Sequence, residues 1–298
     1  MKFNTKCVHG SGRPDSTGAI SPAIYMSSTF SHPKLGDTTG YQYTRESNPT
    51  RDRLEQLIAG LEDGKDALAF SSGMAAVDAV FHLFSPGDHI ILGDDLYGGS
   101  IRMFTNIYEQ NGIEFTYVGT SDLDAVKAAF KPNTKAVYIE TPTNPMMEIT
   151  DVRALCALAH ERNALVIIDN TFLSPYFQKP LTLGADIVVH SGTKFIGGHH
   201  DVISGFTIVN DEELAAKLRL TYKTVGACLF AMDSWLVIRG VKTLALRMEQ
   251  HQKNAIALAE WLKKQPKVTK VLFPGLPEHP GYEINKAQTT GFGGMLSF

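Results

Sequence analysis

The segment "KAVYIETPTNPMMEITDVRALCALAHERNALVIID", residues 135–169, decides the fold. Two short apolar runs, residues 135–140 and 164–169, flank the amphipathic stretch 151–162. Continuous apolar runs of this length predict strands that are buried on both faces, and parallel strands need a crossover that is usually a helix. The segment therefore predicts a strand–helix–strand unit with parallel strands.

The same alternation continues on both sides of this unit and predicts an α/β fold. Its central sheet should be mostly parallel, with helices on both faces. A helix should also begin after the capping residue Asn48, and another should span residues 249–265. The further strands are expected at residues 67–70, 89–93, 114–118, 186–190 and 203–209, and the further helices at 74–84, 100–110 and 122–130.

A length of 298 residues favours one large domain and a smaller one. Residues 1–50 are rich in glycine, proline, serine and threonine, and are predicted to form an irregular arm. Residues 51–245 should form the large domain, and residues 246–298 the start of a smaller C-terminal domain.

Composition excludes several classes of protein. The formal net charge of −3 gives no reason to expect nucleic acid or a membrane surface as a partner. No apolar run is long enough to span a membrane, and the N-terminus lacks the apolar core of a secretory signal. The three cysteines, Cys7, Cys156 and Cys228, are far apart, which argues against a disulfide framework and for a cytoplasmic protein.

Polar residues follow the predicted strands, where ligands of open α/β sheets bind. We expect these residues to converge on one edge of the sheet. They are Ser71, Ser72, Gly73 and Met74; Asp94, Asp95 and Tyr97; Asn144; Asp169, Asn170 and Thr171; and Ser191, Thr193 and Lys194.

Each feature of this set suits one part of a single ligand. The serine–glycine turn at Gly73 opens a helix and suits a phosphate, to which Ser191 and Thr193 could donate hydroxyl groups. Asp169 could hold a protonated ring nitrogen, Tyr97 could stack on a flat ring, and Lys194 could form a Schiff base with an aldehyde. Together these features describe pyridoxal 5'-phosphate (PLP).

Other interpretations of the same residues remain open at this point. Lys194 could be a solvated lysine, Asp169 a helix cap and Tyr97 a packing residue of a turn. A non-catalytic binding module would keep the fold without the chemistry. A metal-dependent hydrolase would use His190, His199, His200 and Asp201, although the side chains of adjacent histidines tend to diverge, whereas zinc needs converging ligands.

The chain resembles the Cys/Met-metabolism family of PLP enzymes, which includes cystathionine γ-lyase, γ-synthase and β-lyase and methionine γ-lyase. The resemblance covers nearly the whole chain and implies the PLP-dependent transferase fold, fold type I, with a smaller α+β C-terminal domain. Its markers are "YQYTRESNPTRDRLE", "AFSSGMAA", "GDDLYGGS", "ETPTNP", "IIDNTF" and "VVHSGTKFIGGHHDVISG".

The resemblance implies a role for each matching residue. Lys194 would hold the cofactor and shuttle protons, Asp169 would pair with the pyridine nitrogen, and Tyr97 would stack on the ring and act as acid and base. Tyr43 and Arg45 would reach the phosphate of a neighbouring subunit, which implies a homodimer, usually assembled as a tetramer in this family. The remaining cofactor contacts would come from Ser72, Gly73, Met74, Ser191 and Thr193 at the phosphate and from Asn144 near the phenolic oxygen.

Gly99 distinguishes the expected reaction within the family. Methionine γ-lyases often have cysteine at this position, whereas cystathionine lyases and synthases of the "YGG" type have glycine, so Gly99 favours cystathionine as the substrate. The expected reaction is γ-elimination to cysteine, 2-oxobutanoate and ammonia. The alternatives are γ-synthase, β-lyase and methionine γ-lyase activity. The family's C-terminal domain continues past "GFGGMLSF", residues 291–298. We therefore expect a truncated chain that holds PLP but turns over substrate poorly, with the arginine for the substrate carboxylate beyond Phe298.

Overall fold

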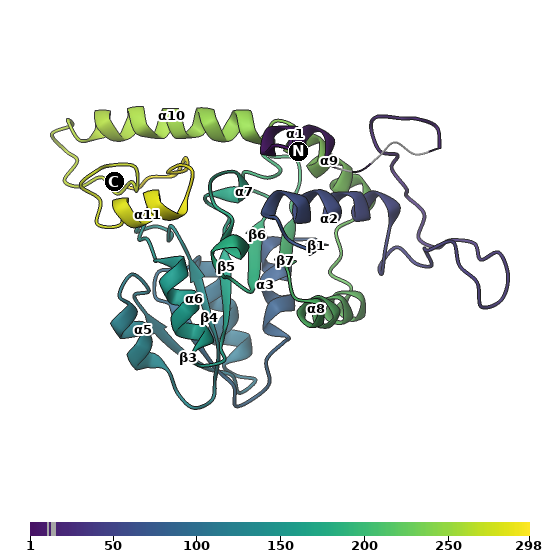
Figure 1. The fold of residues 1–298 in the computed structure, drawn as a ribbon, viewed down its shortest axis with the longest axis horizontal. Helices are drawn as coiled ribbons and strands as arrows, with labels where there is room; N and C mark the ends of the chain where they lie inside the picture. The colour runs from purple at the N-terminus through teal and green to yellow at the C-terminus, as the bar shows by residue number, and fades with distance from the viewer. Residues whose placement is uncertain (11, 13–15) are drawn as a thin grey trace. The chain divides into compact units, whose positions relative to one another are not determined.

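The computed structural model describes residues 1–10, 12 and 16–298 (Figure 1). Among them, seven strands form one sheet in the order β1-β7-β6-β5-β4-β2-β3. Strands β2 to β6 pair in parallel, and β1 pairs with β7 antiparallel. The predicted α/β fold with a mostly parallel sheet is confirmed. The strands are β1 Asp66–Phe70, β2 His89–Gly93, β3 Glu114–Val118, β4 Thr134–Glu140, β5 Leu165–Asp169, β6 Ile187–Ser191 and β7 Gly205–Val209.

The helices follow the predicted pattern, with five additions among the described residues. The sequence analysis did not predict α1, α7, α8, α9 or α11, and α10 begins five residues earlier than expected. No helix in the described part of the chain is long and apolar enough to cross a membrane. The helices are α1 Phe3–His9, α2 Pro49–Glu62, α3 Gly73–Phe81, α4 Gly98–Met103, α5 Leu123–Ala129, α6 Val152–His160, α7 Ser174–Phe177, α8 Glu212–Val225, α9 Ala231–Val241, α10 Leu244–Leu262 and α11 Tyr282–Gln288.

Two compact units make up the described chain. The first unit contains residues 1–83 and 190–245, and the second contains residues 84–189 and 246–298. In the first unit, α2, α3 and α8 pack against the β1–β7 pair. The division into an arm (1–50), a large domain (51–245) and a C-terminal domain (246–298) stays a prediction.

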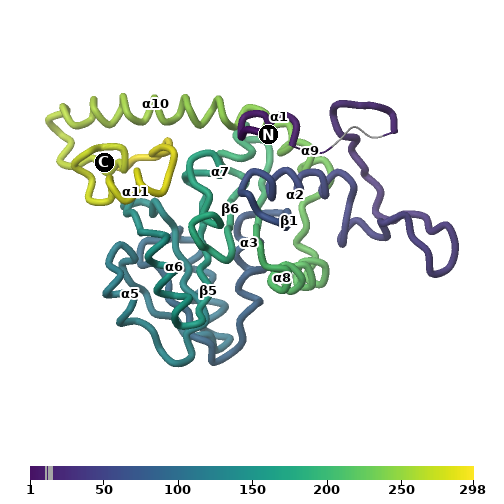
Figure 2. Tube along the Cα trace, viewed as in Figure 1, coloured from purple at the N-terminus to yellow at the C-terminus, as the bar shows by residue number. Residues whose placement is uncertain are grey.

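The second unit has its core around the parallel strands. Buried valines and isoleucines of β4 and β5 pack against the apolar face of α6. The long helix α10, drawn in yellow-green in Figure 2, contributes Ala255 and Ala259 to a smaller cluster with Phe273 and Leu276. Apolar side chains at helical and strand spacing thus explain both clusters.

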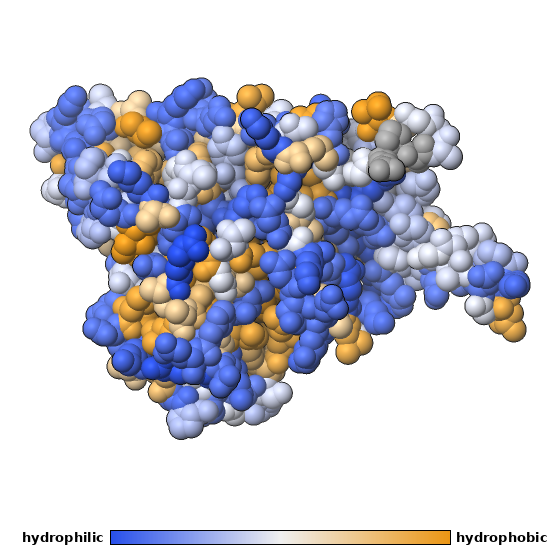
Figure 3. Space-filling view, in the orientation of Figure 1, coloured by the Kyte–Doolittle hydropathy of each residue, from blue (hydrophilic) through white to orange (hydrophobic). Residues whose placement is uncertain are grey.

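The N-terminal arm extends away from α2 within the first unit (Figure 2). Between residues 16 and 47, the one pairing of strand type is the isolated bridge between Thr29 and Tyr43. The face shown in Figure 3 carries hydrophobic and hydrophilic side chains side by side on this arm. Ile20, Met26 and Leu35 are exposed, so the arm leaves apolar surface uncovered within the chain.

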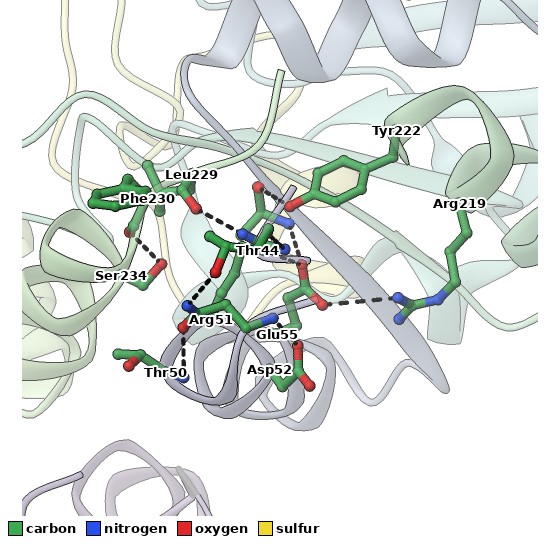
Figure 4. Close-up of polar contacts among 12 residues, drawn as sticks. Thr44, Thr50, Arg51, Asp52, Glu55, Arg219, Tyr222, Leu229, Phe230 and Ser234 are labelled. Carbon is green, nitrogen blue, oxygen red and sulfur yellow. Dashed lines mark hydrogen bonds and ion pairs between the residues drawn. The ribbon is translucent and has the colours of Figure 1, made fainter. Parts of the chain in front are cut away.

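A buried arginine fixes the end of this arm. Arg51 on α2 is fully buried, and its Nη2 donates to the carbonyl of Thr44 at 2.7 Å. Its Nη1 donates to the carbonyl of Leu229 at 3.2 Å (Figure 4). Thr44 is buried, whereas its neighbours Tyr43 and Arg45 are exposed. Arg51 therefore fixes the backbone at Thr44, between Tyr43 and Arg45. These are the two arm residues that are predicted to reach the cofactor phosphate of a neighbouring subunit.

Glu55, one turn after Arg51, is the titratable member of this cluster (Figure 4). It accepts the backbone N–H of Ala69 at 3.1 Å. Burial raises its pKa from 4.5 to about 7, although the guanidinium groups of Arg51 and Arg219 lower it. The folded protein therefore binds this proton more tightly than the unfolded chain does. The resulting stability is present below about pH 4.5 and is lost as the pH rises through 7.

We predict that Glu55→Gln removes this pH dependence. Glutamine keeps an acceptor for Ala69 but carries no charge to bury. Between pH 5 and 8, the free energy of unfolding of the variant should rise relative to wild type by about 2 to 3 kcal/mol. Urea denaturation at both pH values measures this difference. Glu260→Gln, at an exposed glutamate of α10, is the control. An equal difference between Glu55→Gln and wild type at both pH values would contradict the prediction.

Candidate active site

The turn between β1 and α3 is the predicted phosphate-binding turn. Ser72 caps α3, since its Oγ accepts the backbone N–H of Ala75 at 3.0 Å. The first two N–H groups of the helix, those of Gly73 and Met74, have no acceptor within the helix. They lie at the positive end of the helix dipole, where a phosphate is favoured.

Glycines let three backbone segments meet at this turn. A Cβ at Gly73 would lie 3.0 Å from Ser191 Oγ and 3.1 Å from Ser191 Cα. A Cβ at Gly205 on β7 would collide with the carbonyl oxygen of Ser72. The first unit therefore brings Ser72, Gly73 and Ser191 together, and no side chain larger than hydrogen fits between them.

Lys194 lies in a tight turn that follows β6. Its backbone N–H donates to Ser191 O at 3.2 Å, and its carbonyl accepts the N–H of Gly198 at 2.9 Å. Its side chain is exposed, so the amine is accessible while the backbone is fixed. Thr193 Oγ1 donates to Ser204 O at 3.2 Å and accepts Ser204 N–H at 3.1 Å. The Thr193 hydroxyl would have to release Ser204 O in order to donate to a phosphate.

The histidines around this turn have other partners. His190 Nε2 lies 2.5 Å from Glu62 Oε1, and both side chains are buried. This bond ties the end of β6 to α2. His199 Nδ1 lies 2.8 Å from the carbonyl of Gly197, and His200 is exposed. Among the residues that the structure describes, no group of three or more His, Cys, Asp or Glu side chains is arranged to hold a metal ion.

In the second unit, Asp169 ends β5 and faces two neighbouring strands. It pairs with Glu140 at the end of β4 and with Val189 on β6. Its Oδ1 accepts the backbone N–H of Thr171 at 2.9 Å. Asp169 therefore stabilises the turn after β5 but does not cap a helix, since the next helix, α7, begins at Ser174. Asp169 lies at the carboxyl end of the parallel strands.

Tyr97 stands immediately before α4 with its side chain 51% exposed. Its backbone N–H donates to Glu140 Oε1 at 2.9 Å, and its carbonyl accepts the N–H of Ser100 at 2.9 Å. A Cβ at Gly99 would collide with the Tyr97 ring, whose Cζ would lie 3.0 Å away. The backbone of Tyr97 is thus fixed on both sides, and its ring occupies space that only a glycine at position 99 leaves open.

Glu140 is a residue that the sequence analysis missed. Glu140 is the last residue of the predicted strand at 135–140, just as Asp169 is the last residue of the predicted strand at 164–169. Only Asp169 was predicted to be a site residue. Glu140 is only 8% exposed. Burial, and next the charge of Asp169, raise the pKa of Glu140 well above its usual range, while the Tyr97 N–H lowers it. An acidic residue at the end of an apolar strand was the available signal.

The remaining predicted residues lie in loops. Asn144 is half-buried between β4 and α6. In the first unit, the guanidinium of Arg45 stacks over the Tyr43 ring at 5.4 Å from its centroid. Arg45 Nη1 also donates to the carbonyl of Lys223 at 2.6 Å. Both arm residues therefore present polar groups at the surface of the first unit.

The donor set fits the parts of PLP. Backbone N–H groups and the Ser191 hydroxyl suit a phosphate, and a carboxylate at a strand end suits a protonated ring nitrogen. A half-exposed tyrosine ring suits stacking, and an accessible primary amine suits an aldehyde. The assignment of each residue to its contact remains a prediction.

Comparison with known proteins identifies the family. A family model described as Cys/Met metabolism PLP-dependent enzyme matches residues 4–298. The chain is 50% identical to a cystathionine gamma-lyase of Bacillus subtilis (100% of this chain, 79% of the relative) and 50% identical to a cystathionine beta-lyase of Lactococcus lactis (99% and 78%). A crystal structure of cystathionine gamma-lyase from Lactobacillus plantarum complexed with L-serine superimposes with a TM-score of 0.97 at 49% identity (99% and 78%).

We predict that Gly205→Ala damages the anion-binding turn. The added methyl group must displace the Ser72 carbonyl, and overpacking of this kind costs about 1 to 3 kcal/mol. Thermal unfolding should show the loss of stability, and titration with PLP should show weaker binding. Gly60→Ala is the control, because a Cβ at this position of α2 meets nothing within 4 Å. Unchanged stability and PLP affinity of Gly205→Ala would contradict the tight packing.

Proposed function

Because the chain belongs to the Cys/Met metabolism family of PLP-dependent enzymes, we propose that it is a carbon–sulfur lyase of transsulfuration. It cleaves cystathionine by γ-elimination to cysteine, 2-oxobutanoate and ammonia. The observation that supports cystathionine over methionine as the substrate is Gly99, where a Cβ would collide with the Tyr97 ring. Identity to the named relatives does not decide the reaction, since a gamma-lyase and a beta-lyase are equally similar.

The residues would divide the chemistry as follows. PLP, when bound, withdraws electrons from the carbon that loses a proton. Lys194 Nζ would take the proton from the α-carbon and then one from the β-carbon, which γ-elimination requires. Tyr97 Oη would give a proton to the departing sulfur. Asp169 would hold the pyridine nitrogen in its protonated form.

The phosphate and the ring oxygen would be held by fixed groups. The N–H groups of Gly73 and Met74 point from a helix N-terminus that the Ser72 cap holds in place. The hydroxyls of Ser191 and Thr193 would add donors at the phosphate. Asn144 would donate to the phenolic oxygen.

The assembly proposed is a homodimer as the catalytic unit, within a homotetramer in the cytoplasm. The exposed apolar residues of the arm support it, because such surface is normally covered in an assembly. Tyr43 and Arg45 would reach the cofactor phosphate of the neighbouring subunit. The same proposal includes the division of the chain into the arm (residues 1–50), the large domain (51–245) and the C-terminal domain (246–298).

Two classes of alternative are less well supported. Within the family, γ-synthase, β-lyase and methionine γ-lyase activities use the same cofactor residues. A non-catalytic binding module would have no need of Lys194, Asp169 and Tyr97 together. A metal-dependent hydrolase would need His190, whose Nε2 is bound to buried Glu62.

The first test is the visible absorption spectrum of the purified protein. Wild type should be yellow, and Lys194→Ala should lack the band of the lysine-bound cofactor, because only a primary amine forms this bond. Lys264→Ala, at an exposed lysine, is the control and should keep the band. A protein that stays colourless with added PLP, or a band that persists in Lys194→Ala, would overturn the assignment.

A panel of substrates tests the reaction. Cystathionine should yield cysteine and 2-oxobutanoate. Homocysteine and pyruvate would instead indicate β-elimination, and cystathionine formed from an O-acyl-homoserine and cysteine would indicate γ-replacement. Release of methanethiol from methionine would support methionine γ-lyase activity. Mass spectrometry of the products distinguishes these outcomes, and any dominant product other than cysteine with 2-oxobutanoate would refute the γ-lyase proposal.

A further inference from the structure

Two carboxyl groups end neighbouring strands in the second unit, and only one of them has an assigned role. Glu140 and Asp169 are partners in the parallel register of β4 and β5. Partners in a parallel pair direct their side chains to the same face of the sheet. Asp169 is assigned to the cofactor nitrogen by the proposed function, whereas nothing in that proposal uses Glu140.

The hydrogen bond of Glu140 shows what this side chain does. Its Oε1 accepts the backbone N–H of Tyr97 at 2.9 Å, across 43 residues of chain. Tyr97 lies outside the strands, between β2 and the short helix α4. A carboxyl group that is 8% exposed therefore anchors a residue whose ring is 51% exposed.

We propose that Glu140 is a positioning residue of the active site, which fixes the backbone of Tyr97 and thereby the ring that stacks on the cofactor. The inference rests on the proposed function for the role of Tyr97, but the contact between Glu140 and Tyr97 is independent of any cofactor. Gly99 completes the arrangement, since any side chain at that position would displace the ring.

The surroundings of Glu140 favour its neutral form. Burial and the nearby carboxylates of Asp169 and Asp95 raise its pKa. A protonated Glu140 keeps one oxygen free to accept from Tyr97. Glutamine has the same shape and also keeps an acceptor, so it imitates this form. Alanine removes the acceptor and leaves the Tyr97 N–H without its partner.

Hydrogen–deuterium exchange of the cofactor-free protein tests the contact. In Glu140→Ala, the amide of Tyr97 and the first turn of α4 should exchange about tenfold faster than in wild type, because the bond that protects the amide is lost. Glu140→Gln should retain the protection. Glu109→Ala, at an exposed glutamate of the same unit, is the control and should change nothing.

Titration with PLP tests the consequence at the site. Glu140→Ala should raise the dissociation constant of PLP about tenfold and weaken the visible circular dichroism of the bound cofactor. Glu140→Gln should stay within about twofold of wild type. In a Tyr97→Ala background, the Glu140→Ala substitution should have no further effect on PLP affinity, because Glu140 acts through the Tyr97 ring.

The outcomes separate this inference from the proposed function. If wild type binds no PLP, the proposed function fails, and the exchange rates alone decide whether Glu140 anchors Tyr97. If wild type binds PLP but Glu140→Ala leaves exchange unchanged, the inference is wrong and the proposed function stands. If Glu140→Gln is as damaged as Glu140→Ala, charge rather than the hydrogen bond matters, and the inference is also wrong.

Discussion

The close approach of Ser72, Ser191 and Gly205 is the constraint on which the anion-binding side of the site depends. Gly205 has no space for a methyl group against the Ser72 carbonyl, and Gly73 has little against Ser191. These contacts set the N-terminus of α3 beside the end of β6. Because the helix begins there, the N–H groups of Gly73 and Met74, which have no acceptor within the helix, lie close in the chain to the segment that contacts Ser191. The lysine that follows stands in a turn whose backbone is fixed by Ser191 and Gly198.

Parallel pairing imposes the second constraint. It makes Glu140 and Asp169 partners in the register, and neighbouring carboxyl groups do not both ionise readily where one of them, here Glu140, is buried. The raised pKa of Glu140 relieves this conflict by favouring one proton on the pair. The same residue then serves as an acceptor for the Tyr97 backbone. A single register of two strands thus links Asp169, the residue proposed for the cofactor nitrogen, to the carboxyl group that holds the Tyr97 backbone.

Buried polar groups also organise the arm, which has little regular structure of its own. Arg51 donates to two carbonyl groups that are far apart in sequence, those of Thr44 and Leu229. Since a buried guanidinium without acceptors is very costly, this pairing fixes the end of the arm against α2 and the start of α9. Glu55 sits in the same cluster and makes its stability depend on pH.

The sequence by itself determined the parallel strands and the capped start of α2, and it predicted Lys194, Asp169 and Tyr97 as the site residues. Apolar runs and turn residues are local signals, and several motifs in one order are specific to a family. The helices α8 and α9 were missed although Asp211 caps α8 and the predicted strand at residues 203–209 comes directly before it, so both a cap and the strand–helix alternation were available signals for α8. Only the tertiary structure decided which groups meet. Glu140 and Tyr97 are 43 residues apart in the sequence, and Gly205 and Ser72 are more than a hundred residues apart. Contacts over such separations depend on strand register and close packing, which a local sequence pattern does not specify.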